Sequence, residues 1–499
     1  MISRLARRAL TLLAVTTLVF VSGAGADDIN IPDMGSPADA ILNKSQESQI
    51  GRAIMRSIRM SGQVVEDPQV NEYINEIGHR LAAQANDGNH EFTFFVVNDP
   101  RINAFALPGG YIGVHTGLID ASRNEDELAG VLAHEIAHVT QRHIARSIHA
   151  SSRQSLLTTA LMLGALILGA AGGDSDVTQA GIAVAQGTAA QQQINFTRSN
   201  EHEADRIGIA ALAAAGFDPH GMSSFFEVIS RRQLSAPDER MPEFLRTHPV
   251  TSDRIAEARA RAAEYPRIRS TDSTNYGITQ ARLRVAAFDT HEQAVAYFER
   301  RDYANQNDVE RYGRAVAYQR AGRHVEANRI FSELVDTDDK VIAYHIGLGQ
   351  TETALENYVG AQQTFDHALG LFPRNISLVV AYGEALLQLG KAGQAHDMLL
   401  DLLNNVPPTP EQVRLIARAA SMAGESAEAY YYLAEYRFMT GDLVGGVNYL
   451  RQALAMPDLQ EIQRIRFEAR IDFVREFMTE EQLTQLQRSR PAGVTVSRN

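Results

Sequence analysis

Two histidines four residues apart stand in the segment His134-Glu135-Ile136-Ala137-His138, with a glutamate next to the first of them. On a helix, side chains four residues apart lie on one face, so both imidazoles can bind a single metal ion. Glu135 would then be placed to take a proton from a water molecule at that ion. The chemistry that this spacing predicts is metal-assisted hydrolysis. The motif also arises by chance, so it needs a third ligand to support it.

The segment Asn200-Glu201-His202-Glu203-Ala204-Asp205 offers that third ligand. Glu201 and Asp205 are four residues apart in a predicted helix and share a face. Two histidines and one carboxylate are a donor set of catalytic zinc, so we expect one Zn2+ per chain on His134, His138 and Glu201. Asp205 would accept a hydrogen bond from the outer N–H of a ligand histidine. The alternative is that these segments form two acidic helix faces that never meet.

The helix that carries the first motif is predicted to begin at Asn124-Glu125-Asp126-Glu127. Asn124 can cap its first turn, and the acidic residues after it favour the positive end of the helix dipole. On an unbroken helix, His143 would point to a different face from His138, while His202 lies beside the ligand acid. We therefore expect His143 and His202 to be structural or solvated.

Helices and a small sheet are predicted around these motifs. Apolar residues recur at helical spacing over residues 45–85. Phe92 to Val97 is rich in aromatic and β-branched residues and predicts a strand. Asn103 to Leu107 and Tyr111 to His115 flank Pro108-Gly109-Gly110, which indicates a hairpin. Helices are expected from there onward.

The C-terminal part of the chain repeats itself with a period of 34 residues. Two sets of positions keep this step, namely Ala327, Ala361, Ala395 and Ala429, and Phe331, Phe365, Leu399 and Leu433. A small residue followed four positions later by a large apolar one suits the contact of two packed helices. The pattern resembles the tetratricopeptide repeat, although the consensus tryptophan of that repeat is absent. The alternative is an unrelated helical bundle with chance spacing.

Composition limits the function classes. The chain has 499 residues, which suffice for about two to four domains. Its net charge of −13 argues against nucleic-acid binding, because contact with phosphates needs a basic surface. There is no cysteine, which excludes both disulfides and a lipid anchor attached to a cysteine.

A targeting signal is predicted at the start of the chain. Three arginines precede an apolar run from Ala9 to Val21 and the small-residue site Ala24-Gly25-Ala26. The run is shorter than the roughly 20 residues of a membrane span, so we expect cleavage after Ala26 and export, with a membrane anchor as the alternative. The apolar residues 156–171 are also short for a span. We expect a buried or membrane-surface hairpin there, with at most peripheral membrane contact.

The motifs together resemble a known family. His134-Glu135-x-x-His138, Glu201-x-x-Ala204-Asp205 and Asn103-Ala104-Phe105-Ala106-Leu107-Pro108-Gly109-Gly110 resemble the zinc peptidases that include HtpX and the CAAX prenyl proteases. This chain departs from those membrane-embedded members because it has no full membrane span. With a signal peptide in front and tetratricopeptide repeats behind, it resembles the periplasmic members of the family.

The resemblance implies substrates, partners and further site residues. Substrates would be misfolded or stalled outer-membrane β-barrel proteins, and a second, chaperone-like role would assist their assembly. The repeats would contact the outer-membrane β-barrel assembly machinery. In this family the segment Asn103, Ala104, Phe105, Ala106 and Leu107 resembles the edge strand that holds an extended substrate beside the zinc. From the sequence alone, an ordinary core hairpin is the alternative.

Two more residues gain meaning from the same resemblance. Thr247-His248-Pro249, followed by Arg254, resembles the His-Pro segment of the family, whose histidine can be a fourth zinc ligand. Such a ligand would close the open coordination position that a catalytic zinc requires, and so hold the enzyme latent. An oxyanion stabiliser and a plain loop residue are the alternatives for His248. Arg254 is a candidate for oxyanion stabilisation or for support of the site.

The expected fold is mostly α-helical, with an α+β zincin-type metallopeptidase domain that contains a small β-sheet, followed by a tetratricopeptide-repeat superhelix. We expect a signal peptide at 1–26, the zinc metallopeptidase domain at 27–270, linker helices at 271–305 and the repeat domain at 306–490. The expected function is that of a periplasmic zinc-dependent endopeptidase and chaperone. The alternative is mainly a repeat-based binding or chaperone module of outer-membrane assembly with a latent peptidase site.

Overall fold

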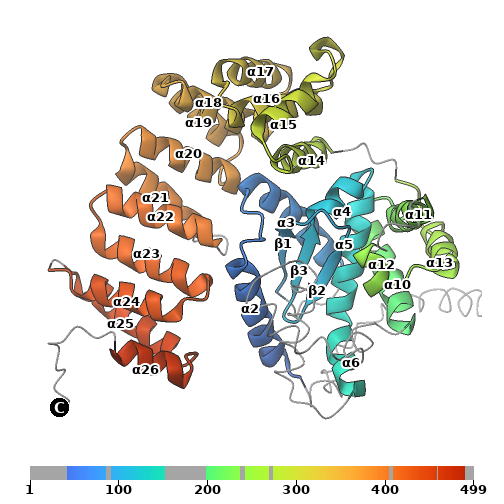
Figure 1. Ribbon diagram of the computed structural model, residues 1–499, viewed down its shortest axis with the longest axis horizontal. Coiled ribbons are helices and arrows are strands. Elements are labelled where there is room, and N and C mark those ends of the chain that lie inside the picture. Colours follow the sequence, from blue (N-terminus) through green and yellow to red (C-terminus); the bar gives the residue numbers. More distant parts are fainter. Residues whose placement is uncertain are drawn as a thin grey trace, which may run out of the picture.

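The computed structural model describes residues 42–85, 91–151, 198–235, 242–268, 273–403, 408–457 and 459–488. Helices dominate these residues, and a three-stranded sheet lies in the N-terminal half (Figure 1). The expected mostly α-helical fold with a small sheet and a helical-repeat array is confirmed. The predicted signal peptide and the apolar residues 156–171 lie outside the described residues. Within the described ranges, no helix combines the length and the apolar character that a membrane span requires.

The sheet consists of β1 (Thr93–Val97), β2 (Ala104–Leu107) and β3 (Tyr111–His115) in the order β1-β3-β2. β2 pairs antiparallel with β3, so the predicted hairpin is confirmed, and β1 pairs parallel with β3. The hairpin turn contains Gly110 at φ +82°, where a Cβ atom would lie 2.0 Å from the carbonyl oxygen of Glu91. Only glycine fits there. The strand order leaves β2 at one edge of the sheet.

Alternate residues of each strand enter different cores, as the two-residue period of a strand requires. Phe94 of β1 joins the core that α3 (Pro68–Ala82) and α5 (Glu125–Thr140) form on one face of the sheet. Phe95 joins the core on the other face, where α2 (Lys44–Met60) packs. β2 alternates in the same way, so Ala106 faces the side of α5. The sheet is therefore covered on both faces by helices.

The other helices of the N-terminal half complete the core around α5. They are α4 (Thr116–Ala121), α6 (His143–Ser151), α10 (Arg198–Ala214), α11 (His220–Ser235), α12 (Glu243–Thr247) and α13 (Ser252–Ala262). Both α10 and α11 pack along α5. Gly208 allows the close approach of α10, because a Cβ atom there would lie 3.1 Å from the backbone nitrogen of His134.

Two helices, α14 (Thr274–Ala286) and α15 (His291–Glu299), and the short 3-10 helix η2 (Tyr303–Asn305) lead into the repeat array, which comprises α16 to α26. The first helices of the four repeats are α16 (Asp308–Arg320), α18 (Ile342–Ala354), α20 (Ile376–Gln388) and α22 (Pro410–Met422). The second helices are α17 (His324–Thr337), α19 (Tyr358–Leu371), α21 (Ala392–Leu403) and α23 (Ser426–Met439). Within each set the helices begin 34 residues apart. The array ends with α24 (Leu443–Leu454), α25 (Glu461–Arg475) and α26 (Glu480–Arg488).

The periodic residues of the sequence make the contacts between these helices. Ala327, Ala361 and Ala395 are completely buried, and so are Phe331, Phe365 and Leu399. Phe331 packs against Gly347 of the next repeat, where a Cβ atom would come within 2.4 Å of its ring. The period of 34 residues therefore reflects a repeated helix packing, as expected.

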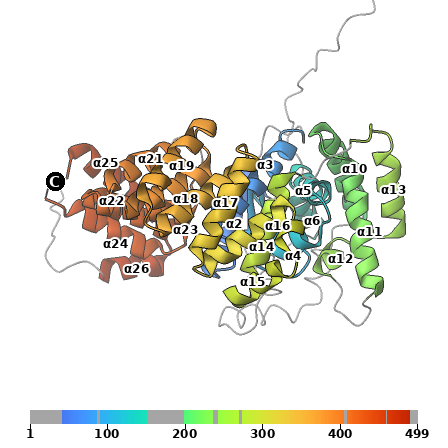
Figure 2. The same cartoon turned by 90° about the horizontal axis from the view of Figure 1, so that it is seen from above.

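The repeat array curves around α2 and α3, which lie between it and α5 (Figure 1; Figure 2). The N-terminal half of α3 is one point of attachment. Asp67, which caps α3, also accepts hydrogen bonds from the Arg282 guanidinium of α14, with Nη2 at 2.6 Å. Glu72 lies at the beginning of α20, where it accepts hydrogen bonds from the backbone amides of Ile376 and Ser377, each at 3.2 Å. A carboxylate at the positive end of a helix dipole is favourable.

Candidate metal centre

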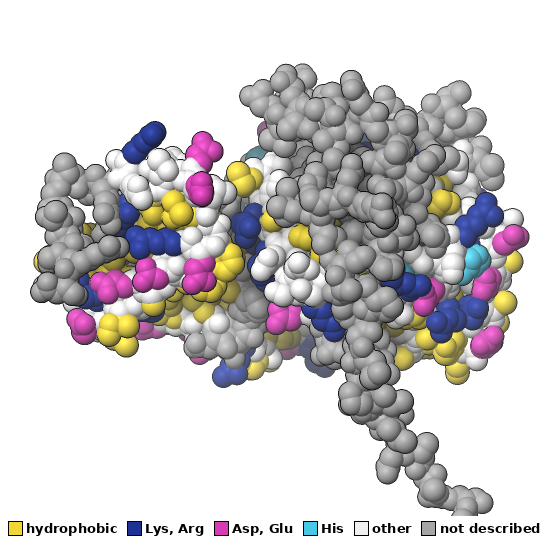
Figure 3. Space-filling model, turned by 90° about the horizontal axis from the view of Figure 1, so that it is seen from below, with side chains coloured by type: hydrophobic (Ala, Val, Ile, Leu, Met, Phe, Trp, Pro, Cys, Tyr) yellow, Lys and Arg dark blue, Asp and Glu magenta, His cyan; other side chains and the backbone are white. Residues whose placement is uncertain are grey.

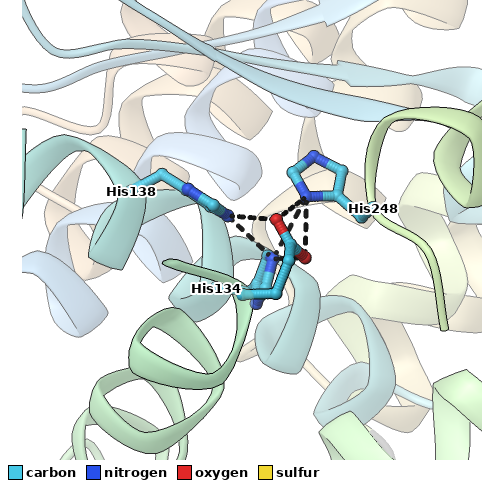
Figure 4. Close-up of side chains that lie close together, drawn as sticks. His134, His138 and His248 are labelled. Carbon is cyan, nitrogen blue, oxygen red and sulfur yellow. Dashed lines mark hydrogen bonds and ion pairs between the residues drawn. The ribbon is translucent and has the colours of Figure 1, made fainter. Parts of the chain in front are cut away.

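Four side chains from three parts of the chain converge on one point. His134 and His138 come from α5, Glu201 comes from α10, and His248 follows directly after α12 (Figure 4). One ligand atom from each lies within 4.8 Å of all the others. His134 Nε2 is 3.0 Å from His138 Nε2 and 3.3 Å from His248 Nδ1. All four side chains are buried.

The approach of α10 to α5 brings the predicted carboxylate to the histidines. Glu201 Oε2 lies 3.5 Å from His134 Nε2, and Glu201 Oε1 lies 3.5 Å from His138 Nε2. The two predicted segments therefore do meet. His248 Nδ1 lies 3.2 Å from Glu201 Oε1, so the histidine of the His-Pro segment belongs to the same cluster.

The electrostatics of this cluster fit a bound cation. Burial lowers the pKa of His134, but its hydrogen bonds to Asp205 and Glu201 outweigh burial and raise the pKa to about 9. Burial would raise the pKa of Glu201, but the neighbouring His248 and His134 hold it well below its ordinary value. The cluster thus favours a positive charge among nitrogen and carboxylate donors, which are donors that zinc accepts.

The outer nitrogen of His134 faces Asp205, as expected for that carboxylate. His134 Nδ1 lies 3.0 Å from Asp205 Oδ1. Arg254 binds the same carboxylate with Nε and Nη2, both at 2.8 Å. Its Nη1 lies 2.8 Å from Glu201 Oε2 and donates to the carbonyl oxygen of Pro249, also at 2.8 Å. All three guanidinium nitrogens of Arg254 are engaged, which favours support over oxyanion stabilisation.

Glu135 is completely buried beside this cluster. Neither of its carboxylate oxygens has a hydrogen-bond partner of normal geometry among the described residues, and His248 Nε2 lies 3.5 Å from Oε1. Burial raises the pKa of Glu135, against the opposing effects of His248, His134 and the backbone amide of Ala106. Burial of a carboxylate that lacks a close partner costs free energy. Such a group is suited to act as a base toward a water molecule that enters the site.

The edge strand β2 lies close to this carboxylate, because Ala106 belongs to β2. The segment before β2 also contacts the element that carries His248. The backbone amide of Phe244 in α12 donates to the carbonyl oxygen of Ile102 at 3.2 Å. Arg101 Nη1 pairs with Glu243 Oε2 of α12 at 2.5 Å. The segment before the candidate edge strand is therefore attached to α12, the helix that His248 directly follows.

The structure corrects the expected direction of the His143 side chain. Its side chain does not point to a different face from His138, because α5 ends at Thr140 and the chain turns back. His143 is completely buried, with Nδ1 2.8 Å from His138 Nδ1. Burial lowers the pKa of His143 to about 4. Nothing in the residue pattern indicated where α5 ends. His202, in contrast, is half-exposed and pairs with Glu257 at 2.7 Å.

Comparisons with known proteins agree with this geometry. Residues 68–262 match peptidase family M48, and residues 352–419 match the tetratricopeptide repeat. A protein of Vibrio cholerae serotype O1 is 36% identical to this chain, over 93% of this chain and 96% of its own length. The β-barrel assembly-enhancing protease of Escherichia coli strain K12 is 33% identical over the same shares of both chains. The mitochondrial metalloendopeptidase OMA1 of Schizosaccharomyces pombe is 31% identical over 37% of this chain and 50% of its own length.

Proposed function

Because this chain belongs to peptidase family M48 and is similar to β-barrel assembly-enhancing proteases over almost their whole length, we propose that it is a zinc-dependent endopeptidase of the periplasm. Its substrates are misfolded or stalled outer-membrane β-barrel proteins. The observation that carries the proposal is the buried convergence of His134, His138 and Glu201 beside the buried carboxylate of Glu135.

His134, His138 and Glu201 would hold one Zn2+ ion, which supplies Lewis acidity to a water molecule and to the peptide carbonyl group. Glu135 accepts the proton of the attacking water and delivers it to the nitrogen of the leaving amine. Burial raises the pKa of Glu135, which favours the uptake of the proton from the water. Asp205 and Arg254 keep His134 and Glu201 in place.

The edge strand β2 is the proposed seat of the substrate. An extended peptide that pairs with Asn103 to Leu107 would run past Glu135, since Ala106 lies beside that carboxylate. Main-chain pairing ignores most side chains of the bound peptide. An unfolded β-barrel strand meets this requirement, because it is extended and has free backbone groups.

His248 is proposed to restrain the enzyme. Its ring lies within the ligand cluster, at a position where it can act as a fourth ligand and close the site to water. Because α12 is attached to the segment before β2, a peptide that binds to β2 would act on the position of the His248 ring through α12. The oxyanion role remains the alternative for His248.

The proposed periplasmic location is supported by the predicted signal peptide, with cleavage after Ala26. It is also supported by the similarity to β-barrel assembly-enhancing proteases over almost the whole chain. The repeats are proposed to bind the outer-membrane β-barrel assembly machinery and unfolded clients. Stacked helix pairs form an extended curved surface suited to this. Hydrophobic, acidic and basic side chains are interspersed on the face of the array in Figure 3, and Ile462 and Phe473 of α25 are exposed.

A second function is mainly that of a repeat-based chaperone with a latent peptidase site. The observation that favours it is the presence of His248 among the ligand groups. The variant Glu135→Gln distinguishes the two functions, because it removes the base and keeps the metal ligands.

The experiment measures cleavage of casein and of an unfolded outer-membrane β-barrel protein by the wild type, Glu135→Gln and the control Glu257→Gln, with the zinc content of each. We expect equal zinc content and a loss of turnover of about 10²-fold or more in Glu135→Gln alone. Wild-type turnover by zinc-loaded Glu135→Gln would refute the peptidase mechanism. Undiminished suppression of client aggregation by this variant would establish a separate chaperone role.

A further inference from the structure

The chain reverses abruptly between α5 and α6. α5 ends at Thr140, and α6 begins at His143. Arg142, in the connection, has a positive φ of 51°, a left-handed conformation that a residue with a Cβ atom seldom adopts. Backbone strain of this kind persists where the surroundings hold it and is frequent at functional sites.

The side chain of Arg142 is held by residues about 100 positions earlier in the chain. Its Nη2 donates to the carbonyl oxygen of Leu42 at 2.6 Å and to Glu47 Oε1 at 3.2 Å. Glu47 is buried on α2. The tight turn is therefore held by Leu42 and Glu47. It places the ring of His143 against that of His138.

The contacts of His143 form a chain from the ligand cluster to the surface. Its ring meets that of His138 edge-on, with centroids 4.8 Å apart. On the other side, His143 Nε2 lies 3.2 Å from Glu203 Oε2. The same oxygen accepts a hydrogen bond from Arg146 Nη1 at 2.9 Å. Glu203 lies on α10, between the candidate ligand Glu201 and Asp205.

These partners determine where the protons lie. In its neutral form the His143 ring carries one proton, on one of its two nitrogens. The carboxylate of Glu203 only accepts hydrogen bonds, which places this proton on Nε2 and leaves Nδ1 as an acceptor. The 2.8 Å contact between the two Nδ1 atoms then requires His138 to donate. His138 Nε2 is left with its lone pair directed at the ligand cluster.

Each of the two ligand histidines thus has a partner at its outer nitrogen. The outer nitrogen of His134 faces Asp205, which Arg254 holds. The outer nitrogen of His138 faces His143, which contacts Glu203 and, through it, Arg146. Partners of this kind fix the tautomer and orientation of a metal-bound imidazole. α10 supplies the third candidate ligand and the carboxylate in each of these two sets of contacts.

We propose that His143 is a positioning residue for the metal ligand His138, and that Glu203 fixes the proton on its far nitrogen. The proposal rests on the proposed zinc site but not on proteolysis. It predicts that the loss of His143 weakens metal binding and alters ligand geometry without removing a ligand.

The test measures Zn2+ affinity of the full chain by competition with a chromophoric chelator, and the visible absorption of the Co2+-substituted protein. His143→Ala should bind Zn2+ about 10–100-fold more weakly than the wild type and change the Co2+ spectrum. His143→Asn, whose side-chain oxygen is an acceptor, should recover part of the affinity. His202→Ala, at a half-exposed histidine outside the chain of contacts, should match the wild type.

Unfolding of each metal-free variant is followed by circular dichroism, so that loss of fold is distinguished from loss of ligand geometry. Glu203→Gln, a change at a partly exposed side chain, should fold and show a smaller but measurable loss of Zn2+ affinity. Wild-type Zn2+ affinity and Co2+ spectra in folded His143→Ala and Glu203→Gln would overturn the proposal. Full turnover by Glu135→Gln would refute the proposed peptidase mechanism. It would not affect the test of His143, which depends only on metal binding.

Discussion

Replacement of Arg254 by alanine tests what holds the metal centre together. The Arg254 side chain is 3% exposed and binds Asp205 through two nitrogens and Glu201 through the third. It also lies over the ring of Phe226, with Cζ 4.9 Å from the centroid. The removal of one partner of a buried ion pair destabilises a protein by about 3–5 kcal/mol, because the remaining charge stays buried. We therefore expect the free energy of unfolding of metal-free Arg254→Ala to fall by about this amount.

Urea denaturation of the metal-free protein, followed by circular dichroism, measures this change. The control is Arg261→Ala on the same helix, because Arg261 pairs with Glu257 at the surface and such pairs contribute about 0–1 kcal/mol. Arg254→Lys should recover only part of the loss, since lysine keeps the charge but not the planar fork. If Arg254→Ala lost no more than Arg261→Ala, the argument that this guanidinium holds the two carboxylates would be refuted.

Two further predictions concern restraint and pH. His248→Ala should cleave unfolded substrates faster than the wild type at equal zinc content, because the open coordination position is no longer blocked. An oxyanion role would instead slow turnover by about 10²–10³-fold, and an unchanged initial rate would contradict both roles. Burial would raise the pKa of Asp67, but the Arg282 guanidinium lowers it below the ordinary value. The stability that this pair gives is present above the unfolded pKa of about 3.9 and is lost as the pH falls below it. Asp67→Asn should therefore be less stable at pH 7 and show a shallower loss of stability in urea denaturation below about pH 4, and parallel curves would contradict this.

Much of the candidate site could be predicted because its information is local. The spacing of His134 and His138 follows from the helical period, and the same holds for Glu201 and Asp205. The hairpin and the repeat period could also be predicted, because turn residues and periodic alanines are local sequence patterns. These patterns do not require knowledge of which helices meet.

The unpredicted parts depend on long-range contacts. The end of α5 is set by the left-handed turn at Arg142, whose guanidinium binds residues about 100 positions earlier in the chain. A sequence pattern cannot show this partner, so His143 was assigned to the wrong face. The support role of Arg254 was open for the same reason, since only the packing of α13 against α10 brings it to Asp205 and Glu201.

The attachment of α20 to Glu72 has a consequence for attempts to exchange parts between relatives. The Glu72 carboxylate accepts hydrogen bonds from Asn375 Nδ2 at 2.7 Å and from the Ser377 hydroxyl at 2.5 Å, as well as from two backbone amides. Half of this binding site belongs to a helix of the sheet-bearing part, and the other half belongs to the third repeat. A chimera with a foreign repeat array would bring a helix end that is not matched to this carboxylate. The graft would have to include α3 together with the repeats.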